Sequence, residues 1–187
     1  MTRLSFKSSD EMTPEEREQF DRIGKFRKVL ENGAYGGPFD PWIRSPEVAR
    51  RAVSWGNFIW ERTVLDRRLV ELAIIVTARF WESNVEWVSH SRMALENGIS
   101  QEVIEAVFEQ RRPAKAPKDE LLIYDVCRIL HKKHQLPLNL YQQAIDAFGE
   151  RGLVDILATI GYYTFVAMTL SSFDIGLAEG TKGPFPI

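Results

Sequence analysis

The chain has 187 residues, of which 44% are hydrophobic and 27% charged, a balance typical of one globular domain with a sizeable core. A formal net charge of −2, without runs of Lys or Arg, argues against a nucleic-acid partner. The single cysteine, Cys127, cannot form an internal disulfide, and the polar N-terminus lacks the apolar core of a signal peptide. These features predict a cytoplasmic protein.

The first helix signal is Thr13-Pro14-Glu15-Glu16, a capping box with proline at the first helical position. Apolar residues follow at helical spacing, which predicts a helix ending near Asn32-Gly33. Residues 33–41 are rich in Gly and Pro and predict a packed loop. We therefore expect an N-terminal helical extension over residues 1–35, ahead of a helical domain over residues 36–187, the whole forming one compact unit.

Three further helices are predicted in the first half of the chain. The first starts at Ser45-Pro46-Glu47 and ends near Arg62. Its predicted apolar stripe consists of Val48, Ala52, Trp55 and Ile59. Asp66 is placed to cap the next helix, which is apolar from Leu69 to Ala78, and a third helix ends at Asn97-Gly98.

The second half of the chain predicts four more helices. Ser100 caps the first, Pro137 marks the end of the second, and a third starts at Asn139. The last runs from about Gly152 to Phe173 and is apolar nearly all round, but only about fifteen residues follow Asp155 before the serines, against the roughly 20 needed to span a bilayer. No segment shows sustained strand alternation, so the fold class is all-α with no membrane span. Because this helix is apolar nearly all round, we expect part of its surface to be buried against another subunit.

Ionisable residues mark the candidate site. The helix over 69–78 is predicted to be buried, yet it contains Glu71, and a buried carboxylate needs a partner or a proton. In the next helix Glu86 and His90 are four residues apart, and Ser83 lies three residues before Glu86, so the three share one face. The pattern predicts titratable groups in apolar surroundings, where perturbed pKa values arise.

The spacing of these residues resembles that of alkylhydroperoxidase D and its relatives, in which a glutamate, two cysteines and a histidine are separated by eleven, two and three residues. The equivalent positions here are Glu71, Ser83, Glu86 and His90. Residues 86–90, EWVSH, are similar to the cysteine-free branch of the carboxymuconolactone decarboxylase family, where Glu-Trp precedes the histidine. The resemblance spans residues 36–176 and includes Gly37-Pro38-Phe39-Asp40, Ser45-Pro46-Glu47 and Gly161-Tyr162-Tyr163-Thr164.

This resemblance implies an alkylhydroperoxidase D-like helical bundle with helices shared across the interface of a homo-oligomer, often a trimer or hexamer. It also implies a decarboxylase-like lyase that needs no cofactor and acts on a small carboxylate or lactone. In that hypothesis His90 is the acid/base, Glu86 tunes it or relays protons, and Glu71 holds the imidazole. The candidate substrate-binding residues are Ser83, Trp87, Arg68 and Tyr162, with Trp81, Tyr163 and Arg79 as further candidates.

Several alternatives remain open from the sequence. His90 can be a structural histidine, the aromatic residues can belong to the core, and Glu71 can pair with Arg68 or Arg79 in a structural ion pair. A metal bound by Glu71, Glu86 and His90 is conceivable but less favoured. A peroxidase like alkylhydroperoxidase D, a peroxiredoxin-related activity, is disfavoured because positions 83 and 86 supply no thiols. A helical oligomer that binds a small molecule without turnover is the remaining rival.

Overall fold

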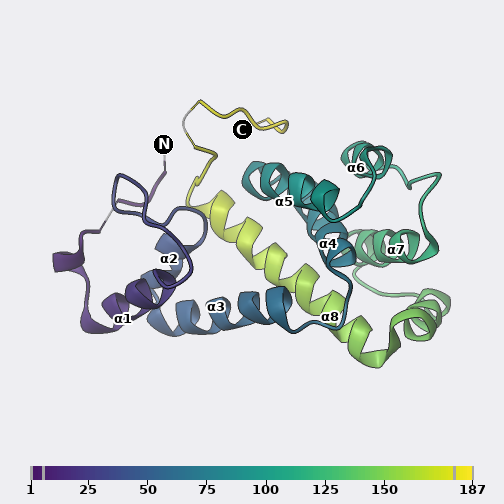
Figure 1. The fold of residues 1–187 in the computed structure, drawn as a ribbon, viewed down its shortest axis with the longest axis horizontal. Helices are drawn as coiled ribbons and strands as arrows, with labels where there is room; N and C mark the ends of the chain where they lie inside the picture. Colours follow the sequence, from purple (N-terminus) through teal and green to yellow (C-terminus); the bar gives the residue numbers. More distant parts are fainter. Residues whose placement is uncertain (1, 6, 179, 187) are drawn as a thin grey trace.

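The computed structural model describes residues 2–5, 7–178 and 180–186. Within these ranges the regular structure is helical and no strand occurs, which confirms the all-α prediction (Figure 1). The elements are η1 (Ser9–Glu11), α1 (Pro14–Ile23), α2 (Phe39–Ile43), α3 (Pro46–Glu61), α4 (Arg67–Phe80), α5 (Asn84–Glu96), α6 (Gln101–Phe108), α7 (Lys118–Lys133) and α8 (Leu138–Ser172).

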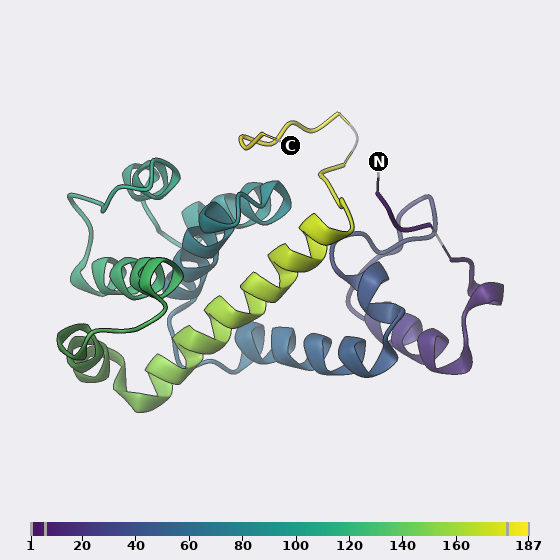
Figure 2. The same ribbon diagram turned by 180° about the vertical axis from the view of Figure 1, so that it is seen from behind.

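Helix α8 crosses the middle of the molecule, with α1–α3 on one side and α4–α7 on the other (Figures 1 and 2). Helix α4 is buried from Leu69 to Ala78 and packs against α5, α7 and α8. Asp66 caps it, accepting a hydrogen bond from the backbone N–H of Arg68 as predicted. From Leu69 to Ala78, α4 is apolar nearly all round and other helices surround it. Glu71 lies within this stretch and is buried with it.

Helix α8 is interrupted at Gly149, whose φ of 71° divides it into the two predicted helical segments. Among the described residues, α8 is the one helix long and apolar enough to cross a membrane by length and composition alone. Its most apolar stretch has a mean hydropathy of 1.6, and 61% of that stretch is buried inside the fold. This burial is consistent with the core helix of a soluble protein.

The N-terminal helix is shorter than predicted. Its capping box at Thr13 forms as expected, but α1 ends at Ile23 rather than near Asn32-Gly33. The backbone carbonyl of Phe20 accepts hydrogen bonds from the N–H of Gly24 and from the hydroxyl of Tyr35, which folds back over the helix end. The chain therefore turns, and the short helix α2 forms within and just beyond the predicted loop.

Helix α3 is rotated relative to the predicted stripe. Val48 and Trp55 are exposed, whereas Val53 and Gly56 face the interior. The reason is close packing against α8: a Cβ atom on Gly56 would lie 2.5 Å from the hydroxyl oxygen of Tyr162. A side chain at this position would force the Tyr162 ring to shift, so Gly56 allows α3 to pack closely against α8.

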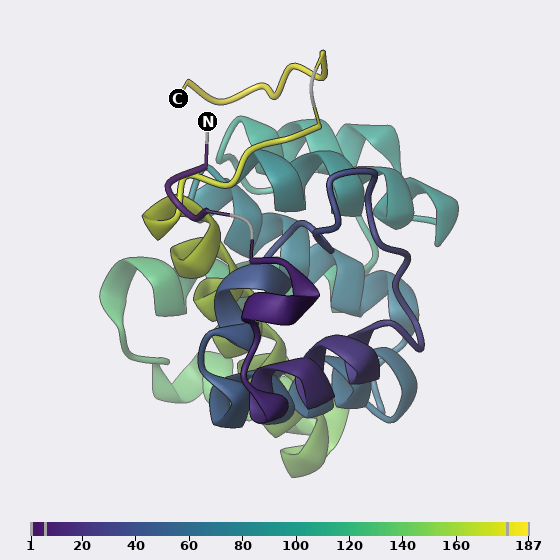
Figure 3. The same cartoon turned by 90° about the vertical axis from the view of Figure 1, so that its left-hand side faces the viewer.

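The C-terminal tail passes over the end of the bundle that contains α5 (Figure 3). The side chain of Asn84 holds it, donating to the carbonyl of Phe185 at 3.0 Å and accepting from its N–H at 2.9 Å. Phe185 then packs against Trp87 and Phe108. The tail thereby closes the core on one side of α5.

Candidate active site

The central feature of the site is a hydrogen bond between the buried side chains of Glu71 and His90. Nδ1 of His90, on α5, lies 2.7 Å from Oε2 of Glu71, on α4. Glu71 is 0% exposed and His90 6% exposed. A carboxylate at Nδ1 favours a proton on that nitrogen, which leaves Nε2 as the nitrogen able to accept or deliver a proton.

Arg67 holds the other side of the Glu71 carboxylate. Its guanidinium pairs with Oε1 of Glu71, one helical turn away. The same guanidinium lies 3.6 Å from the centre of the Trp60 ring, an arrangement favourable for a cation–π interaction. One guanidinium nitrogen, Nη1, is buried without a hydrogen-bond partner among the described residues. Arg67 thus supplies the countercharge that the buried carboxylate requires.

Glu86 lies on the opposite side of the imidazole. Its Oε2 is 3.6 Å from Nε2 of His90, as expected from their four-residue spacing on α5. Burial raises the pKa of Glu86, and the nearby His90 and Arg27 only partly oppose that rise. The four side chains form a continuous row in the order Arg67, Glu71, His90, Glu86, with one carboxyl group beside each imidazole nitrogen.

This row opens into a cavity of about 490 Å³, within the size range of small-molecule sites. Its walls come from the segment before α2 and from helices α2, α3, α5 and α8. The residues lining it are Phe26, Arg27, Gly37, Pro38, Phe39, Val53, Gly56, Asn57, Trp60, Glu61, Val85, Glu86, Ser89, His90, Met93, Tyr162, Tyr163 and Val166. Glu71 and Arg67 lie behind this lining.

Two tyrosines form the α8 side of the cavity. The edge of the Tyr163 ring approaches the ring of His90, with centroids 4.9 Å apart and planes at 83°. Burial raises the pKa of Tyr162 and of Tyr163, and the carboxyl of Glu86 raises both further. Both hydroxyls therefore stay protonated at neutral pH and can donate hydrogen bonds.

Three of the candidate substrate-binding residues do not reach this cavity. Ser83 lies just before α5 and lines a different pocket, beside the C-terminal tail. Trp87 is buried in the core against Phe108 and Phe185. The helical face inferred for Ser83 is wrong because α5 begins only at Asn84, so Ser83 does not continue the phase of Glu86 and His90.

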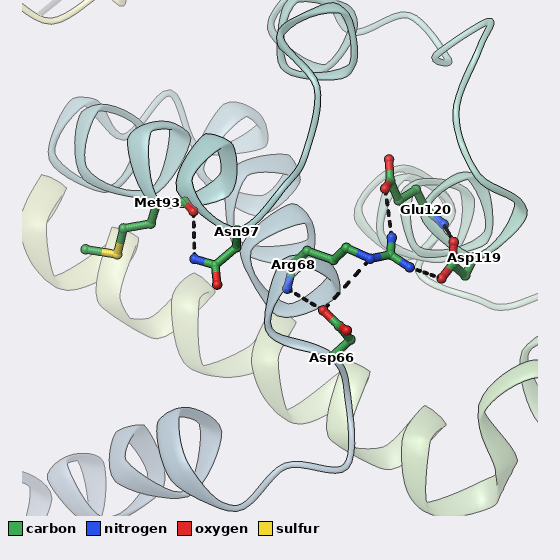
Figure 4. Close-up of polar contacts among 6 residues, drawn as sticks. All are labelled: Asp66, Arg68, Met93, Asn97, Asp119 and Glu120. Carbon is green, nitrogen blue, oxygen red and sulfur yellow. Dashed lines mark hydrogen bonds and ion pairs between the residues drawn. The ribbon is translucent and has the colours of Figure 1, made fainter.

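Arg68 has other partners, shown in Figure 4. Its guanidinium pairs with Asp119 and lies 2.7 Å from the carboxylate of Glu120, both at the start of α7. Asp66 lies 3.9 Å from its Nε. The same view shows Asn97 donating to the carbonyl of Met93 at the end of α5. Arg68 therefore joins α4 to α7 and is absent from the cavity lining.

The cation beside Glu71 was missed by the sequence prediction, which named Arg68 and Arg79. Arg79 instead donates to the carbonyl of Phe108 and pairs with Glu82. The four-residue spacing between Arg67 and Glu71 was the available signal. Arg27 was missed as well, because it lies outside the segment that carries the motif and reaches the cavity only through the turn after α1.

Other titratable groups considered in the sequence lie elsewhere. Cys127 is fully buried on α7, and burial raises the pKa of its thiol. Burial lowers the pKa of His131 to about 4, and its ring stacks on Phe80. No group of three His, Cys, Asp or Glu side chains is arranged to hold a metal ion in the part of the chain that the structure describes.

The fold and site together define an all-helical protein with a buried carboxylate–imidazole pair facing a small-molecule cavity. Residues 46–119 match the model of the carboxymuconolactone decarboxylase family, which confirms the family resemblance. This segment contains Arg67, Glu71, Glu86 and His90, whereas Arg27 and the two tyrosines lie outside it. A comparison with curated proteins found no match.

Proposed function

We propose that the protein is a cytoplasmic, carboxymuconolactone decarboxylase-like lyase that acts by proton transfer on a small carboxylate or lactone. The observation that carries this proposal is the 2.7 Å contact between Glu71 and Nδ1 of His90, at the wall of a cavity large enough for such a substrate. An imidazole oriented by a buried carboxylate is an arrangement suited to general acid–base catalysis.

In the proposed decarboxylation, the bond between the substrate carbon and its carboxylate breaks and carbon dioxide leaves. The electron pair stays on that carbon and is delocalised into an adjacent carbonyl of the substrate. His90 then delivers a proton from Nε2 to the carbon, which completes the product. In this proposal Tyr162 and Tyr163, which line the cavity and keep their protons, donate hydrogen bonds to the carbonyl oxygen as its negative charge develops.

Glu71 and Arg67 act as positioning residues in this proposal. The carboxylate of Glu71 holds the imidazole in one orientation, and Arg67 holds the carboxylate in place. Glu86, with its raised pKa, gives its proton to Nε2 after each turnover and takes up a replacement proton from water, which returns both side chains to their starting state. The proposed reaction uses no cofactor or metal, and its proton transfers are assigned to His90 and Glu86.

The proposal includes a homo-oligomer, a trimer or a hexamer, with part of α8 at the interface. Its support is an exposed apolar face on α8 that contains Val154, Leu157 and Met168. These residues are separated by three and eleven positions, so they lie on the same side of the helix. The proposed partners are otherwise the small-molecule substrate alone, with neither nucleic acid nor membrane involved.

The test is to incubate the protein in D₂O with a panel of γ-lactone carboxylates and β-keto acids. Nuclear magnetic resonance follows loss of the carboxylate and deuterium incorporation at the adjacent carbon. We expect at least one compound to lose carbon dioxide and take up deuterium at a rate that His90→Gln removes. Binding without either reaction would instead support the non-catalytic small-molecule-binding protein.

A further inference from the structure

The cavity has one basic side chain among its described lining residues, apart from the imidazole of His90. Arg27 lies in the segment between α1 and α2 and lines the cavity together with residues of α3, α5 and α8. The other charged lining residues are Glu61 and Glu86, both carboxyl groups. A carboxylate substrate entering this cavity therefore has Arg27 as its available arginine or lysine.

Contacts on one side of Arg27 hold its guanidinium in place. Nε donates a hydrogen bond to the backbone carbonyl of Tyr35 at 2.9 Å, and the guanidinium carbon lies 5.0 Å from the centre of the Phe39 ring. The two terminal nitrogens have neither a hydrogen bond nor an ion pair with the described residues. A guanidinium fixed at Nε with both terminal nitrogens available has the geometry for two parallel hydrogen bonds to a carboxylate.

Polar groups that could hold the rest of such a ligand lie in the same cavity. Asn57 on α3 and Ser89 on α5 line it, and their side chains form no hydrogen bond within the described part of the chain. Ser89 directly precedes His90 in the sequence. An anion held at Arg27 therefore shares the cavity with these two polar side chains and with the imidazole of His90.

We propose that Arg27 binds a carboxylate group of the substrate, and that the turn between α1 and α2 is therefore part of the substrate site. This inference rests on the proposed function and specifies its substrate class. The turn precedes the family-matched residues 46–119, so substrate choice would depend on a segment outside them. Glu61 favours the same arrangement, because a carboxylate on the α3 side of the cavity repels a carboxylate ligand from that side.

The experiment measures the dissociation constants of benzoate, phenylacetate and a γ-lactone carboxylate by calorimetry, each beside its methyl ester. We expect the wild type to bind at least one acid roughly tenfold more tightly than its ester, the effect of one charge-assisted hydrogen-bonded pair. Arg27→Gln should abolish this preference. Lys28→Gln, which removes the same charge from the next residue, should retain it.

A further variant separates charge from structure. Arg27→Lys keeps the positive charge but loses the hydrogen bond from Nε to Tyr35. It should keep part of the preference for the acid, more than Arg27→Gln keeps, if Arg27 binds the ligand, because the charge remains while the paired hydrogen bonds are lost. If Arg27→Lys and Arg27→Gln lose affinity equally for acids and esters, Arg27 only stabilises the turn. Equal binding of acids and esters by the wild type, or no binding of any acid, would also overturn the proposal.

Turnover gives a separate result. His90→Gln should remove turnover while leaving the preference for the acid unchanged, because it retains Arg27. If the protein prefers acids but turns over no substrate, the proposed enzymatic function is wrong and the carboxylate-binding role of Arg27 is supported. If the protein turns over a substrate and Arg27→Gln does not change the Michaelis constant, the carboxylate-binding role of Arg27 is wrong and the proposed enzymatic function is supported.

Discussion

The guanidinium of Arg67 lies between the ring of Trp60, 3.6 Å from its centre, and the carboxylate of Glu71. Trp60 is on α3 and Arg67 opens α4, so this contact joins the helix on one side of the cavity to the helix behind His90. The position of the imidazole thus depends on a residue that lies behind the cavity lining.

Replacing Arg67 should therefore destabilise the fold. Arg67→Gln leaves a carboxylate that is 0% exposed without its cation. We expect a loss of about 2–4 kcal/mol, below the value for a fully buried pair because Arg67 is partly exposed. Urea denaturation measures it. Arg50→Gln, which breaks an exposed pair with Glu47, should cost less than about 1 kcal/mol. Equal losses in the two variants would show that Glu71 does not depend on Arg67.

His90→Gln should abolish turnover and leave the fold intact. A glutamine amide can still donate to Glu71 but cannot exchange protons near neutral pH. Glu71→Gln should reduce both activity and stability, because it leaves Arg67 unpaired. Thermal unfolding and the deuterium assay read the two effects separately. His131→Gln, which changes a histidine outside the cavity, is the control and should retain turnover. Full turnover by His90→Gln would make His90 a structural residue.

The stability of the protein should depend on pH through Glu86. Burial raises the pKa of this carboxyl above its ordinary value of 4.5, so above pH 4.5 the folded protein holds a proton that the unfolded chain has lost. The free energy of unfolding then falls as the pH rises through the pKa of Glu86 in the folded state. Glu86→Gln removes this pH-dependent fall, because the glutamine amide does not titrate.

We expect Glu86→Gln to match the wild type near pH 4, within about 1 kcal/mol, and to gain stability relative to it as the pH rises. Urea denaturation from about pH 4 to about pH 8 checks this. Glu18→Gln, which changes an exposed carboxylate on α1, should show no such trend. A parallel pH dependence for the wild type and Glu86→Gln would contradict a raised pKa.

Thiol chemistry should be absent. Cys127 is 0% exposed, and burial raises the pKa of its thiol, so the reactive thiolate is suppressed at neutral pH. We expect no labelling by Ellman's reagent until the protein unfolds, and no thiol-dependent reduction of an alkyl hydroperoxide. Peroxidase activity that survives Ser83→Ala but disappears in Cys127→Ser would favour the peroxidase instead.

The exposed apolar face of α8 predicts self-association. Leu157→Glu places a charge between Val154 and Met168 and should shift an oligomer toward the 21.5 kDa monomer in light scattering. Leu138→Glu, an equally large change at an exposed site before the Gly149 break, should leave the assembly unchanged. A wild-type monomer at micromolar concentration would remove the oligomer from the proposal.

Most of the helices could be predicted because their caps and apolar spacing are local properties of the chain. Asp66 and Ser100 form their predicted caps, and Gly98 takes the positive φ expected after α5. The end of α1 could not be predicted, because it depends on Tyr35 folding back onto the carbonyl of Phe20. Such contacts between distant residues leave no periodic signal in the sequence.

The same distinction applies to the site. Glu86 and His90 lie close together because they share a helix, and their proximity followed from spacing alone. The absence of Ser83 from the cavity lining could not be predicted without knowing that α5 begins at Asn84. Arg27 lines the cavity because tertiary contacts set the path of the segment between α1 and α2. The sequence shows that position 27 is an arginine, but it does not show that this arginine lies at the cavity.

Gly56 has a consequence for selectivity. A methyl group there would collide with the hydroxyl end of Tyr162, and the ring would have to move. Both residues line the cavity, so any such shift changes its internal shape. The shape of the cavity therefore depends in part on a position with no side chain. Exchange of Gly56 for alanine would therefore reshape the cavity without adding or removing any ionisable group.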